Sequence, residues 1–378
     1  MNIRKKIAPR TPLLRLTAVG LTAALALTGC ASLENTNSNA DASNPASSPS
    51  GKESGNSNSA SGNDSVATGG EGFAGAREKS QSFGSDAAPG QFPRTVTHAR
   101  GTTELKEKPQ RVVVLESGEL DSVLALGMKP VGMTTSKGQN PVPDYMADKA
   151  SDIETVGTIN EVNMEKIASL NPDLIIGSQL RMDKHYDQLN SIAPTVFSIR
   201  PGYTWKENFR LIGEALGEEE RTEQVMADYD KKIEEVKKVI EDGPASEDTT
   251  VTILRFMPGK VRLYGRLSLI GTVLDDAGLA RPANQDIEEL AAEISPENID
   301  QADADYIFYC SYGDPSATGQ DTAVSTAAFQ QLPAVKDGHA IEVSDDTWAL
   351  GLGPLGAQKI ASDLADYLSC LLYTSPSP

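Results

Sequence analysis

The sequence predicts an α/β protein of two lobes, each built on a parallel sheet and bridged by a single long helix. Short apolar runs alternate with helical segments in both halves of the chain. A phrase at 164–175 recurs at 296–307, and an amphipathic stretch at 204–242 separates the two copies. Alternating strands and helices favour parallel sheets, because a crossover helix returns the chain to the same edge.

The start of the chain has the pattern of a lipoprotein signal. A positively charged segment precedes the uncharged run 16–27, which is too short to span a bilayer that needs about 20 helical residues. Leu27-Thr28-Gly29-Cys30 follows at once, and a cysteine in that setting is lipidated after cleavage just before it. We therefore expect residues 1–29 to be a signal peptide and Cys30 to anchor the mature chain to the outer face of the cytoplasmic membrane.

Residues 30–93 are predicted to form a disordered tether. The stretch is rich in Ser, Asn, Ala and Gly, and such a composition buries too little apolar surface to offset chain entropy. A flexible coil of about 60 residues spans roughly 40–45 Å. This tether would let a folded domain move above the membrane without leaving it.

The N-terminal lobe is predicted at 94–203. Four short apolar runs indicate strands, at 111–115, 130–133, 173–176 and 195–199. Helices are expected between these strands. They lie at 120–126, where Gly127 provides the stop, and at 165–170.

The connecting helix is predicted at 204–242 and the C-terminal lobe at 243–369. Apolar residues recur at helical spacing in the connecting stretch, and Gly217 is expected to break it. In the lobe we expect strands at 251–254 and 305–309, helices at 268–277 and from 296, and a turn at Pro258-Gly259. Residues 370–378 have no helical pattern, and we expect them to be a spurious tail.

The recurring phrase relates the two lobes. A Glu-x-Ile followed by an Asp-x-Ile at 165–175 returns with the same spacing at 297–307. A helix–turn–strand unit explains the isoleucines, which pack inward, and the aspartates, which end the turn. The unit does not require the glutamates, although an acid at a helix start gains about 0.3–1 kcal/mol from the helix dipole.

Composition disfavours several classes of function. The net charge is −19, whereas a nucleic-acid partner requires a basic face. Three scattered histidines and three cysteines do not make a metal site or a zinc ribbon. Nucleophile-elbow, phosphate-loop and zinc-protease motifs are missing from the sequence. We therefore expect no enzymatic activity, no bound metal and no cofactor.

Five phrases in order, after the lipoprotein signal, resemble the iron–siderophore substrate-binding lipoproteins of bacterial ABC importers. They are RVVVLESGELDSVLALGMKPVG (111–132), NMEKIASLNPDLIIG (163–177), RPGYTWKENF (200–209), RFMPGKVRLYGRLSLIGTVLDDAGLARP (255–282) and WALGLGPLGAQKIASDLADYL (348–368). The resemblance implies two Rossmann-like lobes with a ligand cleft between them. It implies a monomeric receptor that passes a ferric siderophore to a permease with a cytoplasmic ATPase. Haem or cobalamin as the ligand remains the alternative.

Cationic and aromatic side chains near strand ends are the candidates for holding such a ligand. Guanidinium groups bind carboxylate-like oxygens in a bidentate manner, and open α/β sheets bind ligands at the carboxyl ends of their strands. Lys260 is a weaker candidate, Glu116 and Glu119 serve either as ligand contacts or as helix caps, and Trp205 is expected to be a packing anchor. The predicted ligand residues are Arg181, Arg200, Tyr203, Arg255, Arg262, Tyr264, Tyr312 and Trp348.

The resemblance also implies one glutamate on each lobe that docks into arginine pockets of the permease. Glu165 and Glu297 occupy the matching positions of the two copies of the repeat. A two-fold permease would require one acidic contact from each lobe, which supports this assignment. The alternative is that both residues only stabilise helix starts.

Overall fold

The computed structural model describes residues 66–67, 69–70, 73–136, 140–243 and 248–370. All of them belong to one structural unit, Asn56–Pro378. The predicted signal peptide, Cys30, most of the tether and residues 371–378 lie outside the described residues. Within the described ranges, none of the helices combines the length and the apolar character that crossing a membrane requires.

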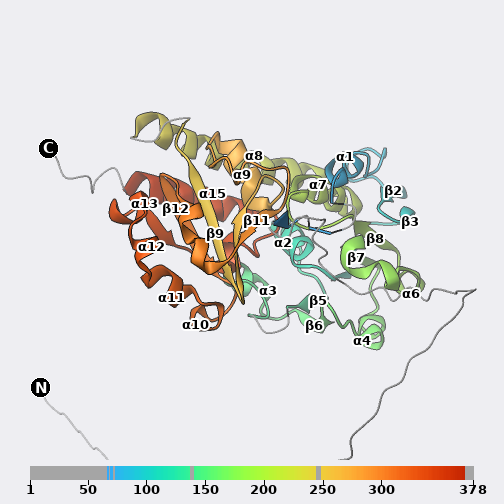
Figure 1. Ribbon diagram of the computed structural model, residues 1–378. Helices are drawn as coiled ribbons and strands as arrows, with labels where there is room; N and C mark the ends of the chain where they lie inside the picture. Colours follow the sequence, from blue (N-terminus) through green and yellow to red (C-terminus); the bar gives the residue numbers. More distant parts are fainter. Residues whose placement is uncertain (1–65, 68, 71–72, 137–139, 244–247, 371–378) are drawn as a thin grey trace, which may run out of the picture. The chain divides into compact units, whose positions relative to one another are not determined.

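The N-terminal lobe contains a five-stranded parallel sheet in the order β6-β5-β4-β7-β8 (Figure 1). Its strands are β4 (Val112–Val114), β5 (Gly132–Thr135), β6 (Glu154–Thr158), β7 (Leu174–Ser178) and β8 (Thr195–Ser198). The helical segments between them are α2 (Ser117–Ala125), η1 (Asp144–Met146), α3 (Ala147–Ala150), α4 (Met164–Ser169), α5 (Gln179–Met182), η2 (Asp183–His185) and α6 (Tyr186–Ile192). A separate hairpin pairs β2 (Arg94–His98) with β3 (Gly101–Leu105).

The C-terminal lobe contains a six-stranded mixed sheet in the order β1-β11-β10-β9-β12-β13. Its strands are β9 (Val251–Met257), β10 (Lys260–Tyr264), β11 (Ala291–Ile294), β12 (Tyr306–Ser311), β13 (Ala340–Glu342) and, from the N-terminal segment, β1 (Val66–Ala67). Its parallel pairs are β9–β12 and β12–β13, and the other neighbouring strands pair antiparallel. The predicted parallel sheet is thus limited to β9, β12 and β13, because Gly259 adopts a φ of 78° and turns β9 directly into an antiparallel β10.

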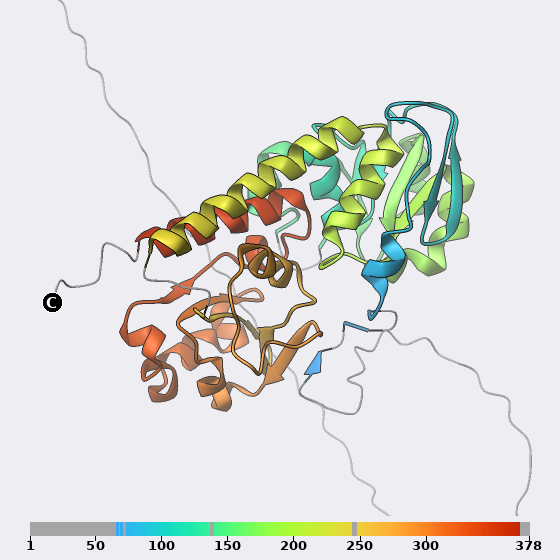
Figure 2. The ribbon, with the colours of Figure 1, turned by 90° about the horizontal axis from the view of Figure 1, so that it is seen from above.

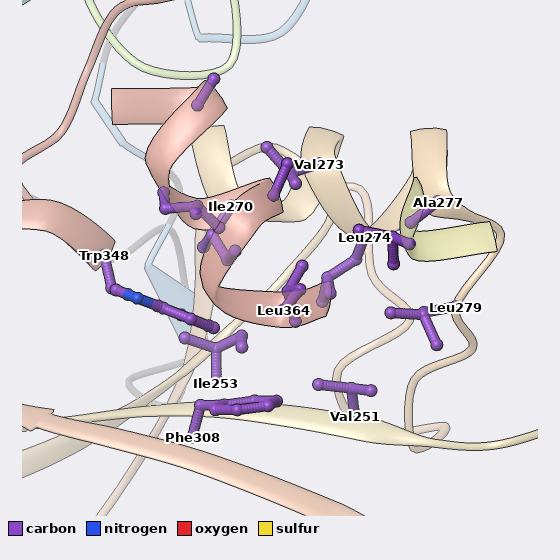
Figure 3. Close-up of a cluster of buried hydrophobic side chains, with 14 of the residues drawn as sticks. Val251, Ile253, Ile270, Val273, Leu274, Ala277, Leu279, Phe308, Trp348 and Leu364 are labelled. Carbon is purple, nitrogen blue, oxygen red and sulfur yellow. The ribbon is translucent and has the colours of Figure 1, made fainter. Parts of the chain in front are cut away.

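Short helices surround the C-terminal sheet, and two longer ones cover one of its faces. The segments are α9 (Leu269–Ala277), η3 (Pro296–Ala302), α10 (Pro315–Thr318), α11 (Gln320–Ser325), α12 (Ala327–Gln330), α13 (Pro333–Lys336), α14 (Asp345–Trp348) and α15 (Pro354–Cys370). Figure 3 shows side chains of α9 and α15 above Ile253 and Phe308 of the sheet. The largest hydrophobic core of the lobe lies there.

The internal repeat has the predicted physical basis. In the first copy, the Asp173 carboxylate accepts hydrogen bonds from the backbone N–H groups of Gln110 and Arg111, just before β4. In the second copy, Asp305 accepts one from the N–H of Thr250, just before β9. Each aspartate thereby joins its own strand to the parallel neighbour, β7 to β4 and β12 to β9.

The connecting region consists of two helices, as predicted. Helix α7 (Trp205–Leu216) ends at Gly217, which adopts a left-handed φ of 63°, and α8 (Glu219–Asp242) is 24 residues long. The buried residues of α8 follow the predicted stripe: Thr222, Val225, Tyr229, Ile233, Val236 and Ile240. Helix α8 is the predicted long helix, and it packs along α15 (Figure 2).

A buried carboxylate joins α2 of the N-terminal lobe to the start of α15. Asp121 accepts hydrogen bonds from the backbone N–H groups of Leu355 (2.7 Å) and Gly356 (2.9 Å), and from the Tyr145 hydroxyl (2.7 Å). The helix N-terminus suits an anion, but burial still raises the pKa of Asp121 to about 6. A Cβ at Gly353 would lie only 2.6 Å from the Asp121 carboxyl carbon, which explains a glycine there.

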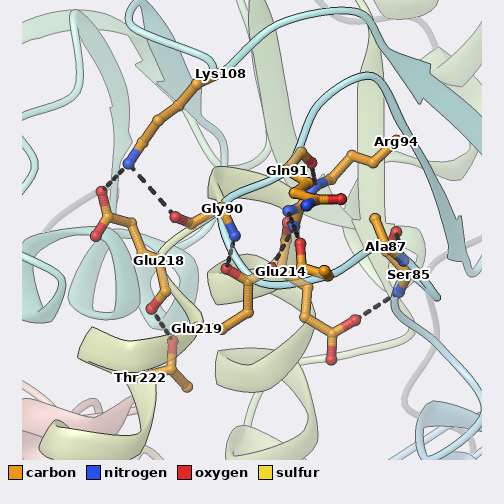
Figure 4. Close-up of polar contacts among 12 residues, drawn as sticks. Ser85, Ala87, Gly90, Gln91, Arg94, Lys108, Glu214, Glu218, Glu219 and Thr222 are labelled. Carbon is orange, nitrogen blue, oxygen red and sulfur yellow. Dashed lines mark hydrogen bonds and ion pairs between the residues drawn. The ribbon is translucent and has the colours of Figure 1, made fainter.

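The described part of the predicted tether packs on the folded chain. Helix α1 (Ala76–Ser80) lies against α7, and Phe73 and Ala76 are buried. Further along, the backbone N–H groups of Ser85 and Gly90 donate to Glu214 and Glu219 (Figure 4). The expected coil therefore does not extend to residue 93. Residues 73–93 are ordered by burial against the folded chain and by hydrogen bonds to α7 and α8, and composition does not predict such contacts.

Candidate functional site

Several predicted ligand residues lie after, or near the carboxyl ends of, parallel strands in both lobes, whereas Arg262 and Tyr264 lie in the antiparallel strand β10. Arg181 follows β7, and Arg200 follows β8. In the C-terminal lobe, Arg255 lies in the second half of β9 and Tyr312 directly follows β12. Open α/β sheets bind ligands at this edge, so each lobe brings its candidates to the expected end of its sheet.

Arg255 is buried and ion-paired. Its Nε and Nη2 donate to the two oxygens of Asp345 at 2.6 and 2.7 Å, and its guanidinium lies 4.7 Å from the centre of the Tyr312 ring. Nη1 donates to the Tyr264 hydroxyl at 3.3 Å. Burial lowers the pKa of Arg255, but Tyr264 and the Asp345 carboxylate outweigh burial, so the pKa lies above its ordinary value. The structure thus places two other predicted residues, Tyr264 and Tyr312, around the Arg255 guanidinium.

Arg262 lies directly opposite Arg255 across the β9–β10 pair. Like charges in that position repel each other, and the two guanidinium groups turn to different carboxylates. Arg262 Nε donates to Glu293 at 2.8 Å, and Lys260 Nζ contacts both oxygens of the same Glu293 at 2.6 and 2.7 Å. Burial raises the pKa of Glu293, but these two hydrogen-bonded cations hold it below its usual range.

Arg200 in the N-terminal lobe has no carboxylate partner among the described residues. Its Nη1 donates to the carbonyl oxygen of Gly69 at 3.1 Å, and its guanidinium lies 4.1 Å from the centre of the Phe73 ring. Tyr203 completes the group, because its hydroxyl donates to the Phe73 carbonyl at 2.5 Å. Burial without a counter-charge lowers the pKa of Arg200 to about 10.

Two buried glutamates lie beside Arg181. Glu116 caps α2 by accepting from the N–H of Ser117, and its carboxylate lies 3.4 Å from Arg181 Nε. Glu119 accepts from the Ser198 hydroxyl at 2.5 Å, while its other oxygen has no hydrogen-bond partner among the described residues. Burial and the nearby Glu116 raise the pKa of Glu119 to about 8. The helix-cap alternative therefore holds for Glu116, and the raised pKa favours the protonated form of Glu119.

The two tryptophans are both core residues. Trp205 is the predicted packing anchor: it contacts Tyr229 edge-on and donates from Nε1 to Thr272 at 2.9 Å. The sequence predicts Trp348 at the ligand site, and the structure corrects this expectation. Trp348 is 2% exposed and stacks on Phe308 at 4.8 Å (Figure 3), because α14 turns it inward onto the sheet.

The two repeat glutamates are exposed, as the docking prediction requires. Glu165 lies in the first turn of α4, and Glu297 lies in the first turn of η3. In each copy the isoleucine two residues after the glutamate, Ile167 or Ile299, is buried in the core of its lobe. Core packing therefore leaves both carboxylates free for another role.

The candidate ligand residues lie neither in a group of metal ligands nor in the wall of the polar hollow described below. Within the described ranges, no three His, Cys, Asp or Glu side chains are grouped closely enough to hold a metal ion. A polar hollow of about 600 Å³ lies at the start of the lobe instead, between the 81–97 segment and α7, with Arg94 and Glu214 in its wall. Arg94 is occupied there by Glu219 and by backbone carbonyls. Arg210, the other cation in the wall, donates to the Gln81 carbonyl at 3.0 Å and lies 3.7 Å from Glu214.

Sequence reasoning did not find the partners of the predicted cations. Asp345 and Glu293 neutralise the C-terminal arginines, and Phe73 covers Arg200. An aromatic residue within a Gly- and Ser-rich segment was the available signal for Phe73. No local pattern indicates Asp345, which is separated from Arg255 by 90 positions.

Comparison with known proteins places this arrangement in a family. Residues 112–347 match the family described as periplasmic binding protein. The chain is 35% identical over 305 residues to the "Probable siderophore-binding lipoprotein YfiY" of Bacillus subtilis (strain 168), covering 77% of this chain and 93% of that protein. It is 30% identical over 294 residues to the petrobactin-binding protein YclQ of the same strain, covering 74% and 88%.

A solved structure agrees with the sequence relatives. Staphylococcus aureus SirA complexed with staphyloferrin B matches with a TM-score of 0.64 and 32% identity, covering 72% of this chain and 98% of that one. The family match and these relatives extend over both lobes and the helices that join them. The chain therefore belongs to the periplasmic binding protein family, whose members are binding proteins rather than enzymes.

Proposed function

We propose that this protein captures a ferric siderophore outside the cytoplasmic membrane and delivers it to an ABC importer. The observation that carries the proposal is the set of arginines and tyrosines at the carboxyl ends of the strands of both lobes. Ferric siderophores present oxygen-rich, often anionic surfaces, and guanidinium groups and aromatic rings suit such surfaces. Relatives that are named for siderophores or for ferric citrate support the same ligand class.

Within the proposed site, Arg255, Arg262 and Arg200 bind the ligand's oxygens, and Tyr312 supplies an aromatic wall. Tyr312 is 39% exposed beside a buried guanidinium, so its ring is open to a ligand. Ligand oxygens would share or replace Asp345 and Glu293 as the partners of the C-terminal arginines. Each bidentate, charge-assisted contact is worth about 1.5–3 kcal/mol.

Isothermal titration calorimetry with ferric staphyloferrin B, ferric petrobactin and ferric citrate tests this site, with haem as the competing ligand. Calorimetry is preferred to tryptophan quenching, because both tryptophans are buried. Arg255→Ala, Arg262→Ala and Arg200→Ala should each weaken binding about 10- to 150-fold. Arg210→Ala is the matched control on the exposed side of α7. Three arginine variants within twofold of wild type would refute this site, and tighter binding of haem would refute the ligand class.

Delivery is proposed to depend on Glu165 and Glu297. Both carboxylates are exposed and core packing does not require them. Exposed pairs are worth about 0–1 kcal/mol, but pairs that lose solvent at an interface contribute more. The double variant Glu165→Ala/Glu297→Ala should bind the ligand normally and fail to support radiolabelled iron uptake. Normal uptake by the folded double variant would leave only the helix-dipole role.

The anchor is proposed to be lipidated Cys30, which lies outside the described residues. Relatives that are lipoproteins support extracytoplasmic membrane anchoring. Cys30→Ser should release the chain into the medium or leave the precursor uncut. Unchanged fractionation of this variant with the membrane would rule out the anchor.

A further inference from the structure

Two glutamates are buried close together at the ligand edge of the N-terminal lobe. Glu116 directly precedes α2, Glu119 lies in its first turn, and they are 2% and 1% exposed. Ser178, the last residue of β7, donates to the Glu116 carboxylate at 3.3 Å, and Ser198, the last residue of β8, donates to Glu119 at 2.5 Å. Hydrogen bonds from two parallel strands therefore fix both carboxyl groups at the edge where such sheets bind ligands.

Arg181 is the cation that lies on the solvent side of this carboxyl pair. Its Nε is 3.4 Å from Oε2 of Glu116, and its side chain is 39% exposed, whereas that of Glu116 is 1% exposed. A carboxylate beside Nε fixes the orientation of the guanidinium plane, on which a bidentate contact with a ligand depends. A ligand that approaches this edge therefore meets the guanidinium before it meets the carboxyl groups.

The pair brings two acids to one cation. Burial and then the charge of Glu116 raise the pKa of Glu119 to about 8, although the Ser198 hydrogen bond and the charge of Arg181 act in the opposite direction. One oxygen of Glu119 has no hydrogen-bond partner among the described residues, so the carboxyl group has room for a proton.

Two more charged groups lie near the pair. Asp121, the other acid of α2, accepts its hydrogen bonds from the start of α15. Arg200, which follows β8, is close enough to Arg181 for the two charges to repel each other. The charges that act on Glu119 are thus those of Glu116 and Arg181, and a new charge at Arg181 would change how tightly Glu119 holds its proton.

We propose that Glu116 and Glu119 are positioning residues that hold Arg181 for the anionic oxygens of a ferric siderophore, and that the pair takes up a proton when those oxygens bind. This inference rests on the proposed function and adds a requirement on the ligand, which must bring negative charge to the N-terminal lobe. The proton moves from solvent to the Glu119 carboxylate, and no bond of the ligand changes. Proton uptake on binding makes the affinity fall as the pH rises.

Calorimetric titration at pH 6.5 and pH 8.5 tests this coupling, with whichever of ferric staphyloferrin B, ferric petrobactin or ferric citrate binds wild type. Between these pH values the affinity of wild type should fall about 2- to 5-fold more than that of Glu119→Gln. Protons that belong to the ligand cancel in this comparison, because both proteins receive the same complex. Glu104→Gln is the matched control, since it makes the same change at an exposed carboxylate of β3 in the same lobe.

Proton counts supply the second readout. Binding heats in phosphate and in Tris buffer at pH 8 should show that wild type and Glu104→Gln take up about 0.3–0.5 proton more than Glu119→Gln. Equal counts would overturn the proposal. Net release by wild type relative to Glu119→Gln would also overturn it, because a cationic group of the ligand would then be the partner of the carboxyl pair.

Arg181→Gln tests whether the coupling passes through the guanidinium. The side chain is partly exposed, so the variant should fold even if Glu119→Gln does not. It should bind more weakly than wild type and lose the extra pH dependence, because the ligand's charge no longer lies beside the pair. Wild-type pH dependence in Arg181→Gln would overturn the proposal. If none of the three complexes binds wild type, the proposed function fails and this inference fails with it, whereas binding without the extra proton refutes this inference alone.

Discussion

Arg200 in the N-terminal lobe and Arg255 in the C-terminal lobe are almost equally buried, at 8% and 6% exposure, but their surroundings differ. Arg255 has a bidentate carboxylate, Asp345, whereas Arg200 has a carbonyl and an aromatic ring. The pKa values differ accordingly: burial lowers that of Arg200 to about 10, and that of Arg255 lies above its ordinary value. Among the described residues, a bound anion must therefore compete with a carboxylate at Arg255 and with a carbonyl and an aromatic ring at Arg200.

The largest effect on stability is expected from Asp345→Ala. Removing one partner of a buried ion pair leaves an uncompensated charge, which costs about 3–5 kcal/mol. We expect about 3 kcal/mol here, because Asp345 keeps a side-chain exposure of 13%. Asp346→Ala is the matched control on the same helix, since the hydrogen bond that Asp346 accepts from Asn140 is exposed. Urea denaturation of both variants measures the difference, and equal losses would show that Arg255 does not depend on its carboxylate.

A smaller effect is expected from Glu119→Gln, and only at higher pH. Burial and Glu116 raise the pKa of Glu119 to about 8, so the folded protein keeps a proton that the unfolded chain releases above pH 4.5. Stability from this group is complete below pH 4.5 and declines as the pH rises to about 8. Gln cannot ionise, so the variant should lack this decline, and its stability relative to wild type should rise steadily between pH 5 and pH 8.5.

The measurement is the melting temperature of both proteins across that range. Glu165→Gln is the control, because it makes the same substitution at an exposed carboxylate. In the C-terminal lobe Glu293 has the opposite sign: its pKa is lowered, so its contribution is lost only as the pH falls below about 4.5. A parallel pH profile of Glu119→Gln and wild type would show that Glu119 is ionised at neutral pH.

The smallest effect is expected from Lys260→Ala. Lys260 is 37% exposed on its side chain and shares Glu293 with the more buried Arg262. Because Arg262 still neutralises Glu293, the variant should lose no more than about 1 kcal/mol of unfolding free energy. Arg262→Ala provides the comparison, measured by the same urea titration. A loss from Lys260→Ala as large as that from Asp345→Ala would mean that exposed and buried pairs in this lobe are equally important.

The sequence predicts the elements of this fold better than their partners. Hydrophobic periodicity places α8 and its buried face, and the repeat places Asp173 and Asp305 at equivalent turns, because both signals are local. Arg255 pairs with Asp345 because two distant segments of the chain meet in the fold, and no local sequence pattern predicts that meeting. Trp348 shows the same limit: its Gly-rich surroundings suggest a loop, but the turn of α14 directs the ring into the core.

The opposed pair Arg255 and Arg262 has a consequence for the order of folding. The β9–β10 hairpin is the most local pairing in its sheet, and isolated hairpins of that kind ordinarily form early. Here Arg255 and Arg262 lie opposite each other in the two strands, and Asp345, the partner of Arg255, comes 90 positions later in the chain. During synthesis Glu293, the partner of Arg262, emerges before Asp345, the partner of Arg255. The hairpin can therefore form while Arg255 is still solvated, and the burial of Arg255 is completed only when α14 arrives. A chain truncated before Asp345 should leave Arg255 without its carboxylate, even though every residue of both strands is present.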